Sequence, residues 1–132
     1  MGDWSSAATT WLGIETVTAG EGSVALRMPT RPEMGNLSGV VHGGFIALLA
    51  DSAMGRAMST VLPDGERHYS FDLKTSFISP GRIGEPLEAV GTVLHSGRRT
   101  GVAECRVTGE EGRLVATATA TFIVALPART EE

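Results

Sequence analysis

Apolar and small residues dominate one long stretch of the chain, residues 43–61 (GGFIALLADSAMGRAMSTV). Only Asp51 and Arg56 carry charge within it. A helix that is apolar on every side is typical of a buried helix rather than of an amphipathic surface helix. The stretch gives way to a cluster of turn-forming residues at Leu62-Pro63-Asp64-Gly65. We therefore predict a long buried helix over residues 43–61.

Short alternating segments on either side of this stretch predict β-strands. Before it, residues 12–19 and 23–28 flank Gly20-Glu21-Gly22, which is typical of a hairpin with a tight turn. The same glycines spell G-x-G-x-x-A, but a strand follows them, whereas the dinucleotide-binding motif needs a helix there. After the helix, strands are predicted over residues 67–79, 86–95, 99–108 and 113–124.

The first strand after the helix alternates between apolar and polar residues. Its apolar face holds Tyr69, Phe71, Leu73, Thr75 and Phe77. We expect the helix to pack against Phe71, Leu73 and Phe77. A helix of 19 residues is roughly 28 Å long and needs a broad sheet of about six strands to cover it. The pattern therefore predicts an α+β fold in which a curved antiparallel sheet wraps a long central helix.

Length and composition narrow the possibilities further. The 132 residues predict one domain over 1–132, with a lead-in at 1–11 that includes a short helical turn and a frayed tail at 125–132. Fifteen acidic and eleven basic residues give a net charge of −4, which argues against a general nucleic-acid binder. The single cysteine, Cys105, excludes an intrachain disulfide and a cysteine zinc site, and we expect it in the core rather than as a nucleophile. The chain has no signal-peptide pattern at its start and no membrane-spanning run, so a cytoplasmic location without membrane attachment is expected.

Asp51 is the unusual residue of the predicted helix. Its helical neighbours at three and four positions are Ala47, Leu48, Met54 and Gly55, and none of them can pair with a carboxylate. Burying an unpaired charge costs several kcal/mol, as an order of magnitude. Asp51 is therefore the first candidate for a functional residue.

Residues around the helix are spaced as in a known enzyme family. Asn36 precedes His42-Gly43-Gly44 by six residues, and Asp51 follows His42 by nine. Residues 70–80 and the segment Ser96-Gly97-Arg98-Arg99 match the same family. In this linked set the chain resembles the hotdog-fold acyl-CoA thioesterases, especially the branch typified by phenylacetate-pathway thioesterases. The resemblance extends from about residue 12 to residue 124.

This resemblance implies a hotdog fold, a long helix wrapped by a curved antiparallel sheet. It implies hydrolysis of a small, medium-chain or aryl acyl-CoA to free acid and CoA. It also implies a homodimer with active sites at the interface, and a dimer of dimers as the further assembly. No metal is implied, and the only coenzyme A is that of the substrate.

The start of the helix supplies donors for a carbonyl oxygen that becomes negative during hydrolysis. The amides of Gly43 and Gly44 are expected to be unsatisfied and to lie at the positive end of the helix dipole. The resemblance implies that the Gly43 amide polarises the thioester carbonyl, that His42 makes a positioning hydrogen bond, and that Asn36 contacts the reacting groups across the interface. The alternatives are a tight turn at the glycines, a helix cap at His42 and an ordinary turn residue at Asn36.

The resemblance gives Asp51 the role of general base or nucleophile. A strand hydroxyl helps to hold the water in some relatives, and it corresponds to Ser70, with Tyr69 possible because the preceding loop leaves one residue of uncertainty. The alternative for Asp51 is a carboxylate that turns outward or finds a strand hydroxyl.

Coenzyme A carries phosphates, and arginine suits them through its planar fork of donors. By resemblance, two loops correspond to those that relatives use for the nucleotide end of CoA. The predicted contacts are Ser79, Gly81, Arg82, Gly97, Arg98 and Arg99. The alternative is solubilising charge in surface turns.

Two other functions remain open for this fold. An enoyl-CoA hydratase or dehydratase would need a histidine and an acidic residue over the acyl chain, whereas here the histidine directly precedes Gly-Gly at the helix start. A non-catalytic acyl-CoA-binding protein would bind the same ligand without turnover.

Overall fold

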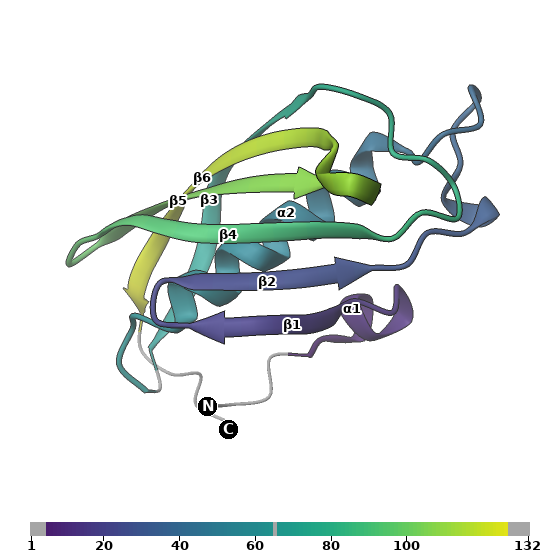
Figure 1. Ribbon diagram of the computed structural model, residues 1–132. Helices are drawn as coiled ribbons and strands as arrows, with labels where there is room; N and C mark the ends of the chain where they lie inside the picture. Colours follow the sequence, from purple (N-terminus) through teal and green to yellow (C-terminus); the bar gives the residue numbers. More distant parts are fainter. Residues whose placement is uncertain (1–4, 65, 127–132) are drawn as a thin grey trace.

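The computed structural model describes residues 5–64 and 66–126 (Figure 1). In chain order the elements are α1 (Ala7–Trp11), β1 (Glu15–Gly20), β2 (Ser23–Met28), a 3-10 turn at Pro32–Met34, α2 (Gly43–Ser59), β3 (Arg67–Phe77), β4 (Leu87–Ser96), β5 (Thr100–Thr108), a second 3-10 turn at Glu110–Gly112 and β6 (Leu114–Leu126). The predicted helix, hairpin and four later strands are all present. β6 runs into the predicted tail as far as Leu126, and residues 1–4 and 127–132 lie outside the described residues.

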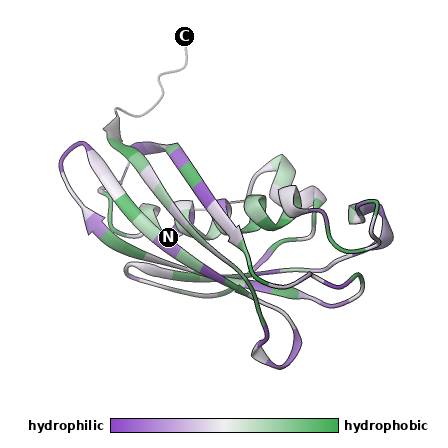
Figure 2. Ribbon diagram, turned by 90° about the horizontal axis from the view of Figure 1, so that it is seen from above, coloured by the Kyte–Doolittle hydropathy of each residue, from purple (hydrophilic) through white to green (hydrophobic). Residues whose placement is uncertain are grey.

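The strands form one six-stranded antiparallel sheet in the order β1-β2-β4-β5-β6-β3. The long helix α2 lies across one face of this curved sheet (Figures 1 and 2). The predicted α+β arrangement of one central helix against a curved antiparallel sheet is therefore confirmed.

Small residues allow α2 to approach the sheet closely. A Cβ added to Gly91 of β4 would lie 2.6 Å from the backbone carbonyl carbon of Ala53, so only glycine fits under the helix there. Along β6 the inward residues Ala116, Ala118 and Ala120 are buried. The density of small residues in β6 thus reflects close packing, as the sequence indicated.

The helix is buried on one side only, contrary to the prediction. Its sheet-facing residues are buried: Ile46, Leu49, Ala50, Ala53, Met54, Ala57 and Met58. The opposite side, which includes Leu48, Asp51 and Ser52, is half-buried. Arg56 is buried as well, and its guanidinium donates to the Thr16 hydroxyl at 3.2 Å. The prediction was wrong because one sheet covers one face of a helix, and the sequence pattern alone does not show what covers the other.

The apolar residues of β3 are more exposed than predicted, although Leu73 and Phe77 oppose the inward residues Ala120 and Ala116 and Phe77 packs against Gly43 of α2, as predicted. Phe71 is 69% exposed and Phe77 is 55% exposed. Leu73 is 39% exposed. The physical reason is position, since β3 is an edge strand and the helix covers the interior of the sheet more fully. Alternation identified the strand and the helix contact of Phe77 correctly, but not how much of each side chain stays exposed.

A β-bulge in β3 changes which side chains point toward the helix. Ser70 pairs with Phe122 of β6, and Asp72 pairs with the next residue, Thr121, so Phe71 has no opposing residue. Because directly opposed residues point to the same face, Ser70 lies on the helix side with the buried Phe122. The predicted face that joined Tyr69 to the later apolar residues is therefore wrong, since the bulge shifts the alternation by one.

Candidate active site

The N-terminus of α2 presents one free backbone donor. His42 is the N-cap, and its Nδ1 accepts a hydrogen bond from the Gly44 amide at 3.1 Å. Because Nδ1 is the acceptor, the imidazole proton is on Nε2. The Gly43 amide makes no hydrogen bond with the described residues. The expectation that both glycine amides are unsatisfied is thus corrected for Gly44 and holds for Gly43.

The ring of Phe77 packs directly over Gly43. A Cβ at Gly43 would lie 2.9 Å from Phe77 Cζ. The two residues line a pocket of about 400 Å³ at the helix start, together with Asn36, Val40, Val41, Ile46 and residues 78–81. Gly43, whose amide has no partner among the described residues, therefore borders a cavity at the helix start.

Asn36 belongs to the same pocket but shapes its own loop. Its Oδ1 accepts hydrogen bonds from the amides of Ser38 at 2.9 Å and Val40 at 3.2 Å. The side-chain NH₂ makes no hydrogen bond with the described residues, so it can still donate. Within one chain Asn36 does not contact Asp51. Gly43 and Asn36, each with a donor that has no partner among the described residues, thus both line the helix-start pocket.

Asp51 has a partner in its own chain. The Ser70 hydroxyl donates to Asp51 Oδ1 at 2.6 Å, and the carboxylate is half-buried rather than fully buried. The bulge in β3 makes this contact, because it places Ser70 on the helix side. Asp51 is thus less buried than predicted, and the alternative in which it finds a strand hydroxyl is the one that the structure shows; of Tyr69 and Ser70, Ser70 makes this contact.

A second pocket, of about 350 Å³, surrounds Asp51. Its lining comes from α1, α2, the start of β3 and β6: Ser6, Thr9, Asp51, Ser52, Gly55, Arg56, Ser59, His68, Tyr69, Ser70 and Phe122. Gly43 does not line it. Asp51 and Gly43 are eight residues apart on one helix, which separates them by about 12 Å along the axis. One chain therefore presents a carboxylate and an amide donor in two separate places.

The first predicted phosphate loop is close to the helix-start pocket. Ser79 and Gly81 line that pocket. The Ser79 hydroxyl donates to the Leu114 carbonyl at 2.6 Å, and the Gly81 carbonyl accepts from the Val41 amide at 2.8 Å. Only Arg82 keeps an exposed side chain without a hydrogen bond among the described residues. Arg82 is thus the residue of this loop that remains available to a phosphate.

The second predicted phosphate loop lies at the other end of the sheet. Gly97, Arg98 and Arg99 form the tip of the β4–β5 hairpin, and both arginines are exposed. Arg82 lies just before the opposite end of β4. A strand of ten residues spans roughly 30 Å. One chain therefore does not bring the two loops together.

A buried ion pair that the sequence did not reveal fixes the Arg82 loop. Glu85 is 4% exposed and accepts hydrogen bonds from the amides of Arg82 at 2.8 Å and Glu110 at 2.7 Å. The Arg113 guanidinium pairs with Glu85 and donates to the Pro80 carbonyl at 2.7 Å. These contacts lower the pKa of Glu85 although burial opposes them. The sequence did not predict this ion pair, because charged residues are common in turns. The pair is buried only because two loops that are distant in sequence come together in the fold.

Other chemistry finds no support in the described residues. Burial raises the pKa of the Cys105 thiol to about 12, so this buried cysteine is a core residue, as predicted. No group of three or more metal-binding side chains occurs within residues 5–64 and 66–126. No helix in the part of the chain that the structure describes has the length and hydropathy to cross a membrane.

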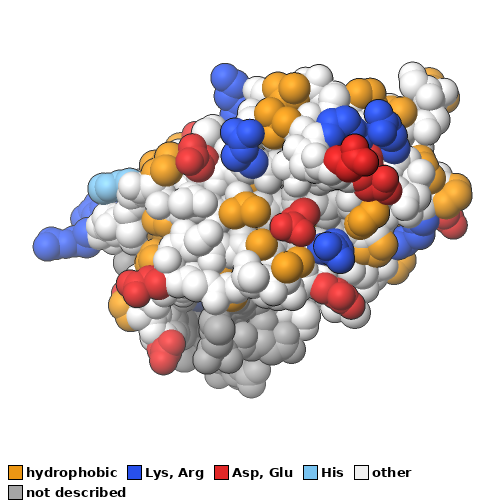
Figure 3. Space-filling view, in the orientation of Figure 1, with side chains coloured by type: hydrophobic (Ala, Val, Ile, Leu, Met, Phe, Trp, Pro, Cys, Tyr) orange, Lys and Arg blue, Asp and Glu red, His pale blue; other side chains and the backbone are white. Residues whose placement is uncertain are grey.

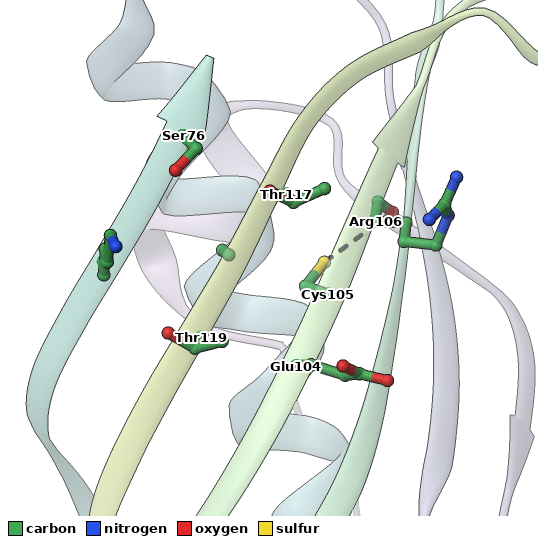
Figure 4. Close-up of a pocket in the computed structure, with 8 residues that line it drawn as sticks. Ser76, Glu104, Cys105, Arg106, Thr117 and Thr119 are labelled. Carbon is green, nitrogen blue, oxygen red and sulfur yellow. Dashed lines mark hydrogen bonds between the residues drawn. The ribbon is translucent and has the colours of Figure 1, made fainter. Parts of the chain in front are cut away.

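The face of the sheet turned away from α2 carries charges of both signs among apolar and neutral side chains (Figure 3). A third pocket, of about 340 Å³, lies on this face over β3, β5 and β6. Glu104 and Arg106 lie on either side of Cys105 on β5, Thr117 and Thr119 lie on the adjacent β6, and Ser76 lies on β3 beyond it (Figure 4). None of the predicted site residues lines this pocket.

Comparison with known proteins identifies the family. A family model described as the thioesterase superfamily matches residues 38–116, more than half of the chain. The chain belongs to the thioesterase superfamily. The matched segment contains the whole of α2 with its N-cap and Asp51.

Individual members of the thioesterase superfamily resemble the chain over most of its length. The acyl-coenzyme A thioesterase PaaI of Escherichia coli K12 is 30% identical over 105 residues, which are 80% of this chain and 73% of PaaI. The solved structure of E. coli PaaI matches with a TM-score of 0.87 and 26% identity, over 95% of this chain and 88% of that chain. A Streptococcus mutans UA159 protein solved bound to acetyl CoA matches with a TM-score of 0.80 and 26% identity, over 88% and 91% of the two chains. The fold is therefore the hotdog fold, and the chain is a thioester hydrolase of the PaaI type.

Proposed function

We propose that this thioesterase hydrolyses acyl-CoA at two composite sites of a homodimer. Each site would combine the Gly43 amide of one copy with the Asp51 carboxylate of the other. The observation that carries the proposal is the free Gly43 amide, placed about 12 Å along the same helix from the carboxylate. A single thioester carbonyl is too small to reach both groups of one chain.

The helix-start pocket suits the carbonyl oxygen of the thioester. His42 occupies the Gly44 amide, so the Gly43 amide is left to donate at the positive end of the helix dipole. Asn36 lines the same pocket, and its side-chain NH₂ would be the second donor to the oxygen. Two fixed donors at the oxygen where negative charge develops stabilise the tetrahedral transition state. Asn36 therefore acts at the site through its amide, while its Oδ1 holds the loop in place.

Asp51 suits the activation of water. As general base, the carboxylate takes a proton from water while the water oxygen bonds to the carbonyl carbon. The tetrahedral intermediate then collapses, the C–S bond breaks, and the CoA thiolate leaves and takes up a proton. The Ser70 hydroxyl holds Oδ1, so the other carboxylate oxygen can receive the proton. A nucleophilic Asp51 would instead form an anhydride that water hydrolyses, with the same products.

The exposed edge of the sheet supports a dimer. β3 is an 11-residue edge strand with Tyr69, Phe71, Phe77 and the following Ile78 all more than half exposed. A long apolar edge of this kind is a template for pairing with another strand. Two copies of β3 paired about a two-fold axis run antiparallel, so the end of one strand lies beside the start of the other.

Such pairing joins the two halves of the site. Gly43 packs on Phe77 at the end of β3, whereas Asp51 bonds to Ser70 near its start. A register that sets Phe77 of one copy near Ser70 of the other therefore brings Gly43 to Asp51. The same two-fold symmetry brings the Gly97–Arg99 hairpin of one copy toward the end of the sheet that carries Arg82 in the other. Both loops could then share the phosphates of one CoA.

One assay tests the function directly. Several acyl-CoAs of increasing length are incubated with the protein, and release of free thiol is followed. We expect Asp51→Asn to lower kcat by about 10²–10⁴-fold, as for loss of a general base. The matched control is Asp64→Asn, which neutralises an exposed aspartate in the loop after α2 and should retain wild-type kcat. Full activity of Asp51→Asn would contradict the role given to Asp51. Hydration of crotonyl-CoA, or binding without turnover, would favour the two alternative functions.

A further inference from the structure

An ion pair supports the wall of the helix-start pocket from outside that pocket. The Arg113 guanidinium pairs with Glu85 and donates to the Ser79 hydroxyl at 2.8 Å and the Pro80 carbonyl at 2.7 Å. Ser79 and Pro80 line the pocket, whereas neither charged residue does. The pair therefore fixes this part of the wall without lining the space that a ligand would fill.

The same carboxylate fixes the backbone of Arg82. Glu85 Oε2 accepts a hydrogen bond from the Arg82 amide at 2.8 Å, and the Glu85 amide donates to the Arg82 carbonyl at 3.1 Å. The Thr30 hydroxyl donates to the Glu85 carbonyl at 2.6 Å and accepts from the Gly84 amide at 2.8 Å. The Arg82 side chain is exposed and makes no hydrogen bond with the described residues. Arg82 thus has a fixed backbone and a guanidinium that is still available to an anion.

Stability alone does not account for a charged pair at this place. Taking two charges out of water costs about as much free energy as their attraction contributes, so apolar residues of similar volume are often at least as stable. The Arg113 Nε atom is buried without a hydrogen-bond partner among the described residues, which adds a further cost. Apolar side chains could fill the same space, but they could not bond to the Arg82 amide or the Pro80 carbonyl. What the pair specifically contributes is therefore the position of residues 79–82.

We propose that Glu85 and Arg113 are positioning residues that hold Arg82 in place for a phosphate of the acyl-CoA. This proposal rests on the proposed function, because it takes the Arg82 loop as a contact of the CoA phosphates. A loop that is already ordered loses little conformational freedom when the ligand binds, so it binds more tightly than a mobile loop. Breaking the pair should therefore weaken CoA binding by about three- to tenfold. It should raise KM more than it lowers kcat, because Gly43 belongs to α2, whose N-cap is His42 and not this loop.

The test measures the Kd of CoA itself by isothermal titration calorimetry. Glu85→Gln and Arg113→Lys each disrupt the pair, and each should raise the Kd by about three- to tenfold. Glu85→Gln removes a negative charge, which on Coulombic grounds alone would strengthen the binding of a polyanion, so weaker binding identifies the lost positioning. Arg113→Lys keeps the net charge but lacks the planar fork that bonds to several acceptors at once. The matched control is Glu88→Gln, which breaks the exposed Arg27–Glu88 pair at 3.8 Å and should bind CoA no more weakly than wild type.

A second substitution separates the positioning of Arg82 from any other effect of the pair. Arg82→Ala should raise the Kd by about tenfold, the value of one charge-assisted contact at an exposed side chain. Adding Glu85→Gln to Arg82→Ala should weaken binding no further, because the group that the pair positions is already absent. Losses that multiply in the double variant, or an unchanged Kd in both single variants of the pair, would overturn the proposal. The calorimetric stoichiometry counts folded sites, so a loss of folded protein does not alter the Kd.

Thiol release from acyl-CoA, measured on the same variants, separates this proposal from the proposed function. Turnover together with a Kd that does not depend on Glu85 and Arg113 overturns the positioning role alone. So does a fall in kcat that exceeds the rise in KM. A Kd that depends on the pair through Arg82, with no thiol release from any acyl-CoA, supports the positioning role and overturns the catalytic proposal alone.

Discussion

Two inactive variants should restore activity to each other if the site is shared between copies. Asp51→Asn removes the proposed base. Asn36→Asp keeps the Oδ1 acceptor that holds the loop but replaces the NH₂ donor by a carboxylate oxygen. Each variant alone should have a kcat about 10²–10⁴-fold below that of wild type. Asp51→Asn lacks the general base, and Asn36→Asp lacks a donor to the oxyanion.

The magnitude of the recovery follows from symmetry. In a mixed dimer of the two variants, one composite site contains both substitutions and the other contains neither. The mixed dimer should therefore have about half of the wild-type activity, far above either parent. If each chain instead formed a complete site, both sites of the mixed dimer would carry one defect and no recovery would occur.

The assay uses coexpression of the two variants with different affinity tags and purification on both tags in turn. Mass spectrometry confirms that both chains are present, and thiol release from an acyl-CoA gives the activity. The control is a doubly tagged dimer of Asp51→Asn with Asp51→Ala, which should stay inactive because both of its sites lack the base. A verified mixed dimer with no more activity than its parents would refute the shared site.

Three further outcomes are expected. Ser70→Ala should lower kcat by about 10–100-fold, the value of a hydrogen bond to a charged group, with little change in KM in the thiol-release assay, because it frees Asp51 to turn. Gly91→Ala should lower the free energy of unfolding by about 1–3 kcal/mol, since its Cβ meets the helix backbone; Gly20→Ala, where nothing lies within 4 Å of the added Cβ, is the matched control in urea melts, and equal stability of the two would contradict the close packing. Glu85→Gln should cost about 2 kcal/mol at pH 7. The folded-state pKa of Glu85 is lowered, so its contribution is present above the unfolded pKa and is lost as the pH falls through the folded pKa. The gap between wild type and Glu85→Gln should therefore close on acidification, and a gap independent of pH would contradict the charged role.

Local patterns were enough to predict most of the fold. The glycine turn at residues 20–22 gave the first hairpin, and the apolar run after His42 gave α2 to within two residues of its end. The four later strands were placed correctly because turn residues separate them and because each strand alternates. Spacing also singled out His42, Gly43 and Asp51, which the structure places on one helix. The turns, the strands and the helix are determined mainly by residues that are close in sequence, so they can be predicted from one sequence.

Features that depend on distant contacts could not be predicted. The exposure of Phe77 follows from the edge position of β3, which is a property of the whole sheet. In the sequence, Glu85 and Arg113 look like ordinary charged residues of surface turns. Only the fold shows that their two loops meet and that the residues form an ion pair. Whether Gly44 is free was decided by the rotamer of His42, which no spacing reveals. The two proposed phosphate loops lie apart for the same reason, since sequence resemblance does not say which copy supplies each one.

The bulge at Phe71 also explains why counting residues through β3 is ambiguous. Seen as an insertion, Phe71 is an additional residue that the edge strand absorbs without moving the ladder on either side. A chain lacking it would have a regular strand, with Ser70 still facing Asp51. Related sequences whose β3 is one residue longer or shorter should therefore be aligned by matching the hydroxyl residue at Ser70, and not by counting residues along the strand. The length of β3 can vary between relatives while the contact at the carboxylate is kept.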